Sequence, residues 1–165
     1  MAQVTHREPE LLGIYLNDHL AGAAAGVDLA KRLADSHRDK PSGPVLKRIA
    51  REVLEDRLAL LKIMAELHVP IRRYKVIGAW LGEKVGRLKP NGHLLKRSAL
   101  SSVLELEAMR LGIEGKGAGW RSLRVLADRY DRLDPDALDR LYARANAQAS
   151  TVEELRVQAV AEALG

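Results

Sequence analysis

PIRRYKVIGAWLGEKVGRLKPNGHLLKR, residues 70–97, is the stretch of sequence that decides how this chain folds. It separates two pairs of apolar helical patterns and is long enough to run the full length of a helical bundle. Helices two and three are therefore expected to be parallel, whereas the shorter links leave helices one and two, and helices three and four, antiparallel. The stretch also predicts a short amphipathic helix of its own, on Val76, Ile77, Trp80, Leu81 and Val85.

Apolar residues recur at helical spacing in four other parts of the chain, on either side of this stretch. The patterns cover about residues 12–34, 42–69, 98–125 and 134–163. Residues that favour helix starts stand at three of these boundaries: Ser42, Pro44, Ser98, Asp134 and Pro135. The sequence therefore predicts an all-α, four-helix bundle in a single domain over residues 1–165, with a long crossover between helices two and three.

The third helix carries apolar residues on two sides. One side has Leu100, Leu104, Leu111, Ala118 and Val125, and the other has Leu106, Met109, Ile113, Trp120 and Leu123. A helix that is apolar on two sides is expected to be covered by more than one neighbour.

Composition limits the classes of function. The chain has no Cys, so it can form neither a disulfide nor a thiolate metal site. Its N-terminal ten residues lack the apolar stretch of a signal peptide, and no run approaches the ~20 apolar residues of a membrane span. Aromatic residues are few, which disfavours a base-stacking nucleic-acid surface. The expected protein is soluble and cytoplasmic, with no specific nucleic-acid partner.

The positive charge of the chain is concentrated in the crossover. Residues 72–97 hold eight basic residues against one acidic, whereas the rest of the chain holds 19 basic and 21 acidic, so this strip accounts for the whole net charge of +5. The strip is a candidate contact for an acidic partner through Arg72, Arg73, Lys75, Trp80, Lys84, Arg87 and Lys89. The competing interpretation is that Trp80 and Leu81 dock on the bundle while the basic side chains are solvated.

Several polar residues interrupt the apolar patterns and are expected to point inward. They are His19, Arg57, Glu107, Glu114, Gln148 and Arg156. A buried carboxylate has to be paired or neutralised, so one interpretation pairs Arg57 with Glu107 or Asp18. Another assembles Asp18, His19, Asp56 and Glu107 as an incomplete metal site. In the third interpretation, all of these groups lie at the edge of the bundle in water.

Helical bundles that hold two metal ions supply a Glu from each of two helices and a Glu-x-x-His from each of the other two. None of the five histidines of this chain follows an acidic residue at that spacing, because the residues three positions earlier are Gln3, Leu16, Ala34, Ala65 and Pro90. No Ser and His pair suggests a nucleophile with its base. Catalysis without a metal is therefore not expected.

Helix order and crossover over about residues 10–163 resemble the ferritin-like superfamily, and in particular its small, uncharacterised bacterial members. The segments LNDHL (16–20), EVLEDR (52–57) and LELE (104–107) stand in the middle of their helices, where that superfamily places its metal ligands. The resemblance implies iron or manganese bound by carboxylates and histidine, with Asp18, His19, Asp56 and Glu107 as the ligands. Since Glu-x-x-His is missing, the leading expectation is a non-catalytic bundle without metal or other cofactor, forming a homo-oligomer with an interaction or structural role. A di-metal binding protein or oxidase with unusual ligands is the alternative.

Overall fold

The computed structural model describes residues 7–72 and 99–165 of the chain. These residues form four α-helices and contain no β-strand: α1 (Arg7–Ser36), α2 (Gly43–Glu66), α4 (Ala99–Leu126) and α5 (Pro135–Leu164). The predicted all-α class is therefore confirmed. The predicted short helix over residues 76–85 and the predicted N-cap Ser98 lie outside the described residues.

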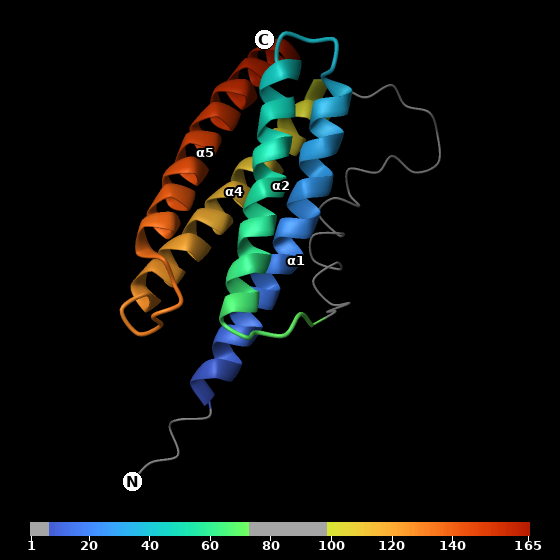
Figure 1. Ribbon diagram of the computed structural model, residues 1–165. Helices are drawn as coiled ribbons and strands as arrows, with labels where there is room; N and C mark the ends of the chain where they lie inside the picture. Colours follow the sequence, from blue (N-terminus) through green and yellow to red (C-terminus); the bar gives the residue numbers. More distant parts are fainter. Residues whose placement is uncertain (1–6, 73–98) are drawn as a thin grey trace.

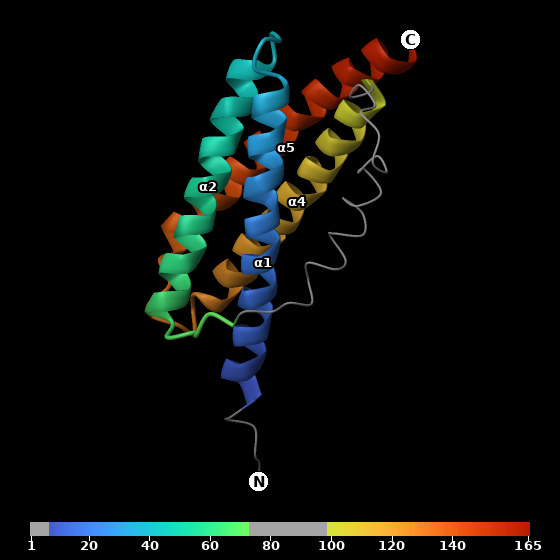
Figure 2. The ribbon, with the colours of Figure 1, turned by 90° about the vertical axis from the view of Figure 1, so that its right-hand side faces the viewer.

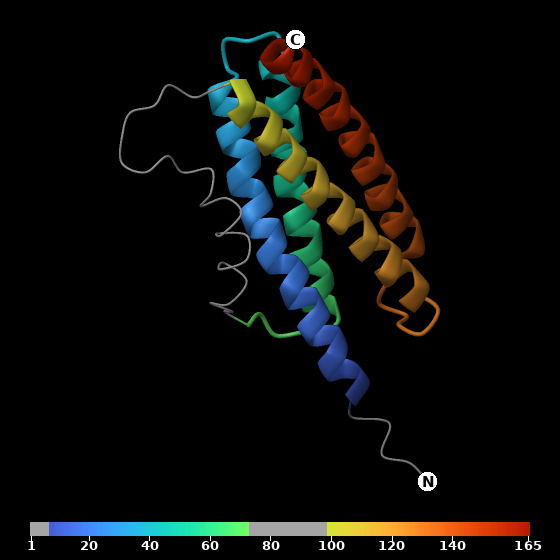
Figure 3. The same cartoon turned by 180° about the vertical axis from the view of Figure 1, so that it is seen from behind.

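The helices are arranged as two antiparallel hairpins, α1 with α2 and α4 with α5 (Figure 1). The hairpins are joined mainly through α1 and α4, which pack against each other and run in opposite directions (Figure 3). The α4–α5 hairpin is inclined to the α1–α2 hairpin (Figure 2). As a result, α2 and α4 run in the same direction, and α5 stands beside α2 without close backbone packing within the described part of the chain.

Local sequence explains how α2 ends. His68 adopts a left-handed backbone conformation with φ 56°, which turns the chain out of the helix. The Val69 N–H donates to the Met64 carbonyl at 2.8 Å, and Pro70 cannot continue the helix. Arg132, from the loop after α4, closes this end by donating to the Glu66 carbonyl at 2.9 Å.

The helix starts differ in how they are capped. Asp134 caps α5, because its carboxylate accepts a hydrogen bond of 3.1 Å from the Ala137 N–H. Ser42 was expected to cap α2 in the same way, but its backbone is already helical and its side chain makes no capping hydrogen bond. The tight turn before α2 relies on Gly43, where a Cβ would lie 2.5 Å from the His37 carbonyl oxygen.

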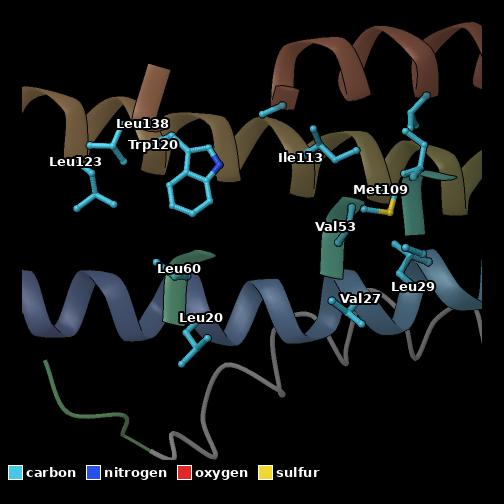
Figure 4. Close-up of a cluster of buried hydrophobic side chains, with 14 of the residues drawn as sticks. Leu20, Val27, Leu29, Val53, Leu60, Met109, Ile113, Trp120, Leu123 and Leu138 are labelled. Carbon is cyan, nitrogen blue, oxygen red and sulfur yellow. The ribbon is translucent and has the colours of Figure 1, made fainter. Parts of the chain in front are cut away.

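The core is a continuous apolar cluster to which all four helices contribute. Trp120 extends from α4 toward Leu60 of α2 and Leu20 of α1, and Ile113 and Leu123 flank it along the same helix (Figure 4). Figure 4 also shows Val53 of α2 near Met109 of α4. The side of α4 that carries Leu106, Met109, Ile113, Trp120 and Leu123 is buried, as its apolar spacing predicts.

A buried amide holds the chain where it leaves α2. Asn17 of α1 is 3% exposed, and its side chain donates to the carbonyls of Gly13 at 2.8 Å and Pro70 at 3.0 Å. Its Oδ1 accepts a hydrogen bond of 2.6 Å from the Arg72 N–H. The segment after α2 is thereby fixed against the first half of α1.

Candidate functional site: a charged cluster in the core

The most distinctive polar group of the core is the carboxylate of Asp56. It lies halfway along α2, on the same face as Val53 and Leu60, and is 1% exposed. An ionised carboxylate removed from water in this way is costly unless charged partners and hydrogen bonds compensate it.

Two cations from the other hairpin compensate Asp56. Lys116 of α4 donates from Nζ to Asp56 Oδ2, and Arg144 of α5 donates from Nη2 to Asp56 Oδ1. Each carboxylate oxygen therefore has its own cationic partner. Because the two cations come from different helices, the single acid on α2 ties α4 and α5 together at one point in the core.

Gln148 completes the cluster and is also 1% exposed. Its Oε1 accepts a hydrogen bond of 2.5 Å from Lys116, and its Nε2 donates to Asp56 Oδ2 at 3.2 Å. The same Nε2 lies 3.1 Å from Glu52 Oε2. Arg144 uses its other terminal nitrogen to bind Glu55 at 3.1 Å, so the cluster continues outward to the half-buried edge of α2.

Burial in the cluster changes the pKa of Lys116. Desolvation lowers the pKa of Lys116, because the ammonium loses its hydration, while the charge and hydrogen bond of Asp56 act in the opposite direction and Arg144 adds to the lowering. The Lys116 side chain is 15% exposed, so the ammonium has little access to water. Asp56 is therefore the main group that keeps Lys116 charged.

The four residues considered as metal ligands are not brought together. Asp18 lies on the solvent side of α1, Asp56 is bound to Lys116 and Arg144, and Glu107 is bound to Arg156 at 3.4 Å. Across residues 7–72 and 99–165, no three His, Asp or Glu side chains gather in a way that could hold a metal ion. This donor set does not fit the di-metal centre that the ferritin-like resemblance implies.

His19 is half-buried and lies between α1 and α4 rather than in the charged cluster. Its ring packs edge-on against Tyr15, with 4.5 Å between the ring centroids, and approaches Gly119 so closely that a Cβ there would lie 3.0 Å from the ring. Tyr15 also donates a hydrogen bond of 2.9 Å to Ser122. Desolvation lowers the pKa of His19, against the opposing charge of Asp18, which favours a neutral ring at this contact.

The other residues expected to point inward are distributed unevenly. Gln148 is buried, whereas Glu107 and Glu114 are about half exposed, with side-chain exposures of 46% and 48%. Arg156 lies at the edge of the bundle and binds Glu153 at 2.8 Å. Arg57 has a buried Nε with no hydrogen-bond partner, and within the described helices no ion pair joins it to Glu107 or Asp18.

The cations of the cluster, Lys116 and Arg144, were not among the residues expected to point inward. Lys116 carried a usable signal, because it stands at helical spacing among Met109, Ile113, Trp120 and Leu123 on the buried side of α4. Arg144 carried a weaker signal, since it precedes Ala145 at the edge of its apolar stripe. Its place in the cluster depends on where α5 lies relative to α2.

Two shallow clefts lie along α5, and one of them is lined in part by Arg144 of the charged cluster. One, of about 600 Å³, lies between α2 and α5 and is lined by Ile63, Leu138, Leu141, Arg140 and Arg144 among others. The second, of about 290 Å³, lies between α4 and α5 beside Gly117, Arg121 and Tyr142. In both clefts the basic side chains have partners on the protein: Arg140 lies 4.0 Å from Asp134, and Arg121 stacks over the ring of Tyr142 at 5.1 Å.

The basic strip expected to contact an acidic partner can be placed only at its first residue. Arg72 is exposed and follows the segment fixed by Asn17. Arg73, Lys75, Trp80, Lys84, Arg87 and Lys89 lie outside the described residues.

Comparison of the chain with protein-family models, with curated proteins and with solved structures found no match. Of the described helices, none has the length and apolar character needed to cross a membrane.

Proposed function

We propose that this protein is a non-catalytic, ferritin-like helical bundle in which the cations of Lys116 and Arg144 take the place that metal ions have in the metal-binding members of that superfamily. The observation that carries the proposal is the pairing of both oxygens of the buried Asp56 carboxylate with these two side chains. The proposed role is that of an interaction or structural protein that forms a homo-oligomer in the cytoplasm.

The arrangement of the helices supports the ferritin-like part of the proposal. Two antiparallel hairpins with α2 and α4 running in the same direction are what a single long middle connection produces in a four-helix bundle. Asp56, Lys116 and Gln148 lie near the middle of α2, α4 and α5, the level at which such bundles build their metal centres.

Electrostatics supports the absence of a metal role. A divalent cation approaching Asp56 would meet two fixed positive charges at hydrogen-bond distance, and repulsion between charges is strong where little water screens it. To bind a metal ion, the carboxylate would have to release Lys116 and Arg144, which would leave the largely buried Lys116 ammonium without its main counter-charge. That exchange is unfavourable.

Metal analysis tests this proposal. Protein purified without chelator, and protein titrated with Fe²⁺ or Mn²⁺ under anaerobic conditions, should contain no stoichiometric metal. Lys116→Glu is the matched comparison, because it replaces a cation beside Asp56 with a carboxylate and should bind Mn²⁺ more tightly than the unmodified chain. Two ions per unmodified chain, lost on Asp56→Asn, would overturn the proposal in favour of a metal-binding bundle.

A further inference from the structure

The outward side of α4 is apolar and exposed. Leu104, Leu111 and Val125 are 39%, 64% and 74% exposed, and Ala118 is also at the surface. These four residues follow one another at intervals of seven, so they form one stripe along the helix. The sequence predicts that α4 is covered on two sides, but among the described residues the outward side meets another helix only at its edges, as where the Tyr15 hydroxyl donates to Ser122.

Small residues accompany this stripe at the spacing of a coiled-coil seam. Ala108, Gly115 and Ser122 stand between the four residues above, so that the steps alternate between four and three. A repeat of 3.5 residues is the spacing with which one helix packs along another. Nothing lies within 4 Å of the place where a Cβ on Gly115 would be, so a second helix has room to approach there.

We propose that a second copy of this chain covers this surface, with the two α4 helices packed antiparallel about a two-fold axis near Ile113. This inference rests on the proposed oligomeric role and adds the interface to it. In the antiparallel register, Leu111 faces Gly115 of the second copy, Leu104 faces Ser122 and Ala108 faces Ala118. Each leucine therefore meets a small residue, whereas a parallel pair would place leucine against leucine and glycine against glycine.

Charge at the edge of the stripe favours the same orientation. Glu107, Glu114 and Arg121 flank it on the side of α5, with the acids nearer the start of α4 and the arginine nearer its end. Antiparallel packing brings Glu107 near Arg121 of the second copy, whereas parallel packing would keep these two residues two heptads apart along the pair. Glu114 lies close to the two-fold axis, where Arg110 of the same chain already binds it at 3.0 Å.

A two-fold dimer needs no other partner, because in an isologous interface the same stripe of each copy packs against that of the other. The competing occupants are residues 73–98 of the same chain and an unrelated protein. Either of these occupants can be distinguished from a second copy, because neither would produce a homodimer that depends on Leu111.

The mass of the purified full chain in solution tests the interface. Analytical ultracentrifugation should give a dimer, and Leu111→Glu should weaken dimerisation by about a hundredfold, because the two-fold axis places two copies of the change in one interface. Leu58→Glu is the matched control, because Leu58 is 54% exposed on α2, away from the stripe, and this variant should remain dimeric. Circular dichroism should show that both variants keep the helical content of the unmodified protein.

Cysteine cross-linking tests the register, because the chain has no Cys of its own. A mixture of Leu111→Cys and Gly115→Cys proteins should form the mixed disulfide faster than either protein alone forms its own. Faster cross-linking of Leu111→Cys to itself would indicate a parallel pair and overturn the proposed register.

The outcomes separate this inference from the proposed function. A monomer at every concentration would remove both the interface and the oligomeric role. A dimer that survives Leu111→Glu would overturn this interface and leave oligomerisation standing. Unfolding of Leu111→Glu in place of dissociation would show that the stripe is covered by the chain itself, and would also overturn the proposal. The metal measurement is independent of all three outcomes.

Discussion

The contact between α1 and α4 and the contact between α2 and α5 hold the same two hairpins together by opposite means. α1 and α4 approach closely, and their contact is formed by side chains such as Leu16, Leu20 and Trp120, with His19 against Gly119. Between α2 and α5 there is a cleft of about 600 Å³, and the link is made by Asp56, Arg144 and Gln148. One side of the bundle is closed by apolar burial and the other by charge.

This difference predicts which substitutions the bundle tolerates at each contact. An apolar contact loses stability in proportion to the volume or area that is altered. A buried ionic contact loses little if both signs are removed together and much if one sign is removed alone. The two contacts should therefore respond to different substitutions.

The largest expected effect is on the charged side. Asp56→Ala should lower the free energy of unfolding by about 3–5 kcal/mol, because it leaves the largely buried ammonium of Lys116 without its main counter-charge and removes one of the two carboxylates that bind Arg144. Replacing Asp56 and Lys116 together by Leu and Met should recover much of this loss. Urea denaturation followed by circular dichroism measures both values.

Asp18→Ala is the control for Asp56→Ala, because it removes an acid from the exposed side of α1 and should change stability by no more than about 0.5 kcal/mol. If Asp56→Ala cost as little as Asp18→Ala, the ionic link between the hairpins would not contribute to stability.

An intermediate effect is expected on the apolar side. Gly119→Ala would place a Cβ 3.0 Å from the ring of His19 and should destabilise the protein by about 1–3 kcal/mol through overpacking. Gly112→Ala is the matched control on the same helix, because nothing lies within 4 Å of its Cβ position and alanine favours the helix by about 1 kcal/mol. Gly119→Ala should therefore lower the melting temperature, and Gly112→Ala should raise it. Equal stabilisation by both substitutions would show that α1 and α4 are not closely packed at His19.

The smallest expected effect is the pH dependence that His19 adds. Burial lowers its pKa below 6.5, so the unfolded chain takes up a proton at a pH where the folded chain does not. The contribution of His19 to stability is therefore complete above pH 6.5 and falls as the pH drops below that value toward the folded-state pKa. His19→Gln should remove this dependence, seen as the difference between the two proteins in denaturation curves at several pH values. If the difference in unfolding free energy between the two proteins were the same at neutral and at mildly acidic pH, the His19 ring would not be buried and neutral.

By itself, the sequence determined the helices and most of their ends. The apolar spacing placed all four helices, and Val69-Pro70 and Asp134-Pro135 marked the end of α2 and the start of α5, because backbone and capping chemistry act over a few residues. It also indicated that polar groups interrupt the apolar stripes. These features depend on residues that are close together in the sequence, so the sequence pattern is enough to predict them.

Only the tertiary structure decided which polar groups meet in the core. Positions 56 and 57 both fit the spacing between Val53 and Leu60, so the pattern could not tell whether Asp56 or Arg57 faces inward. The packing of the hairpins turns Asp56 inward and brings Lys116 and Arg144 to its two oxygens from positions 60 and 88 residues away in the sequence. It also leaves one of the two apolar sides of α4 exposed. Helical spacing specifies a face, whereas the neighbour of that face is set by how separate helices pack.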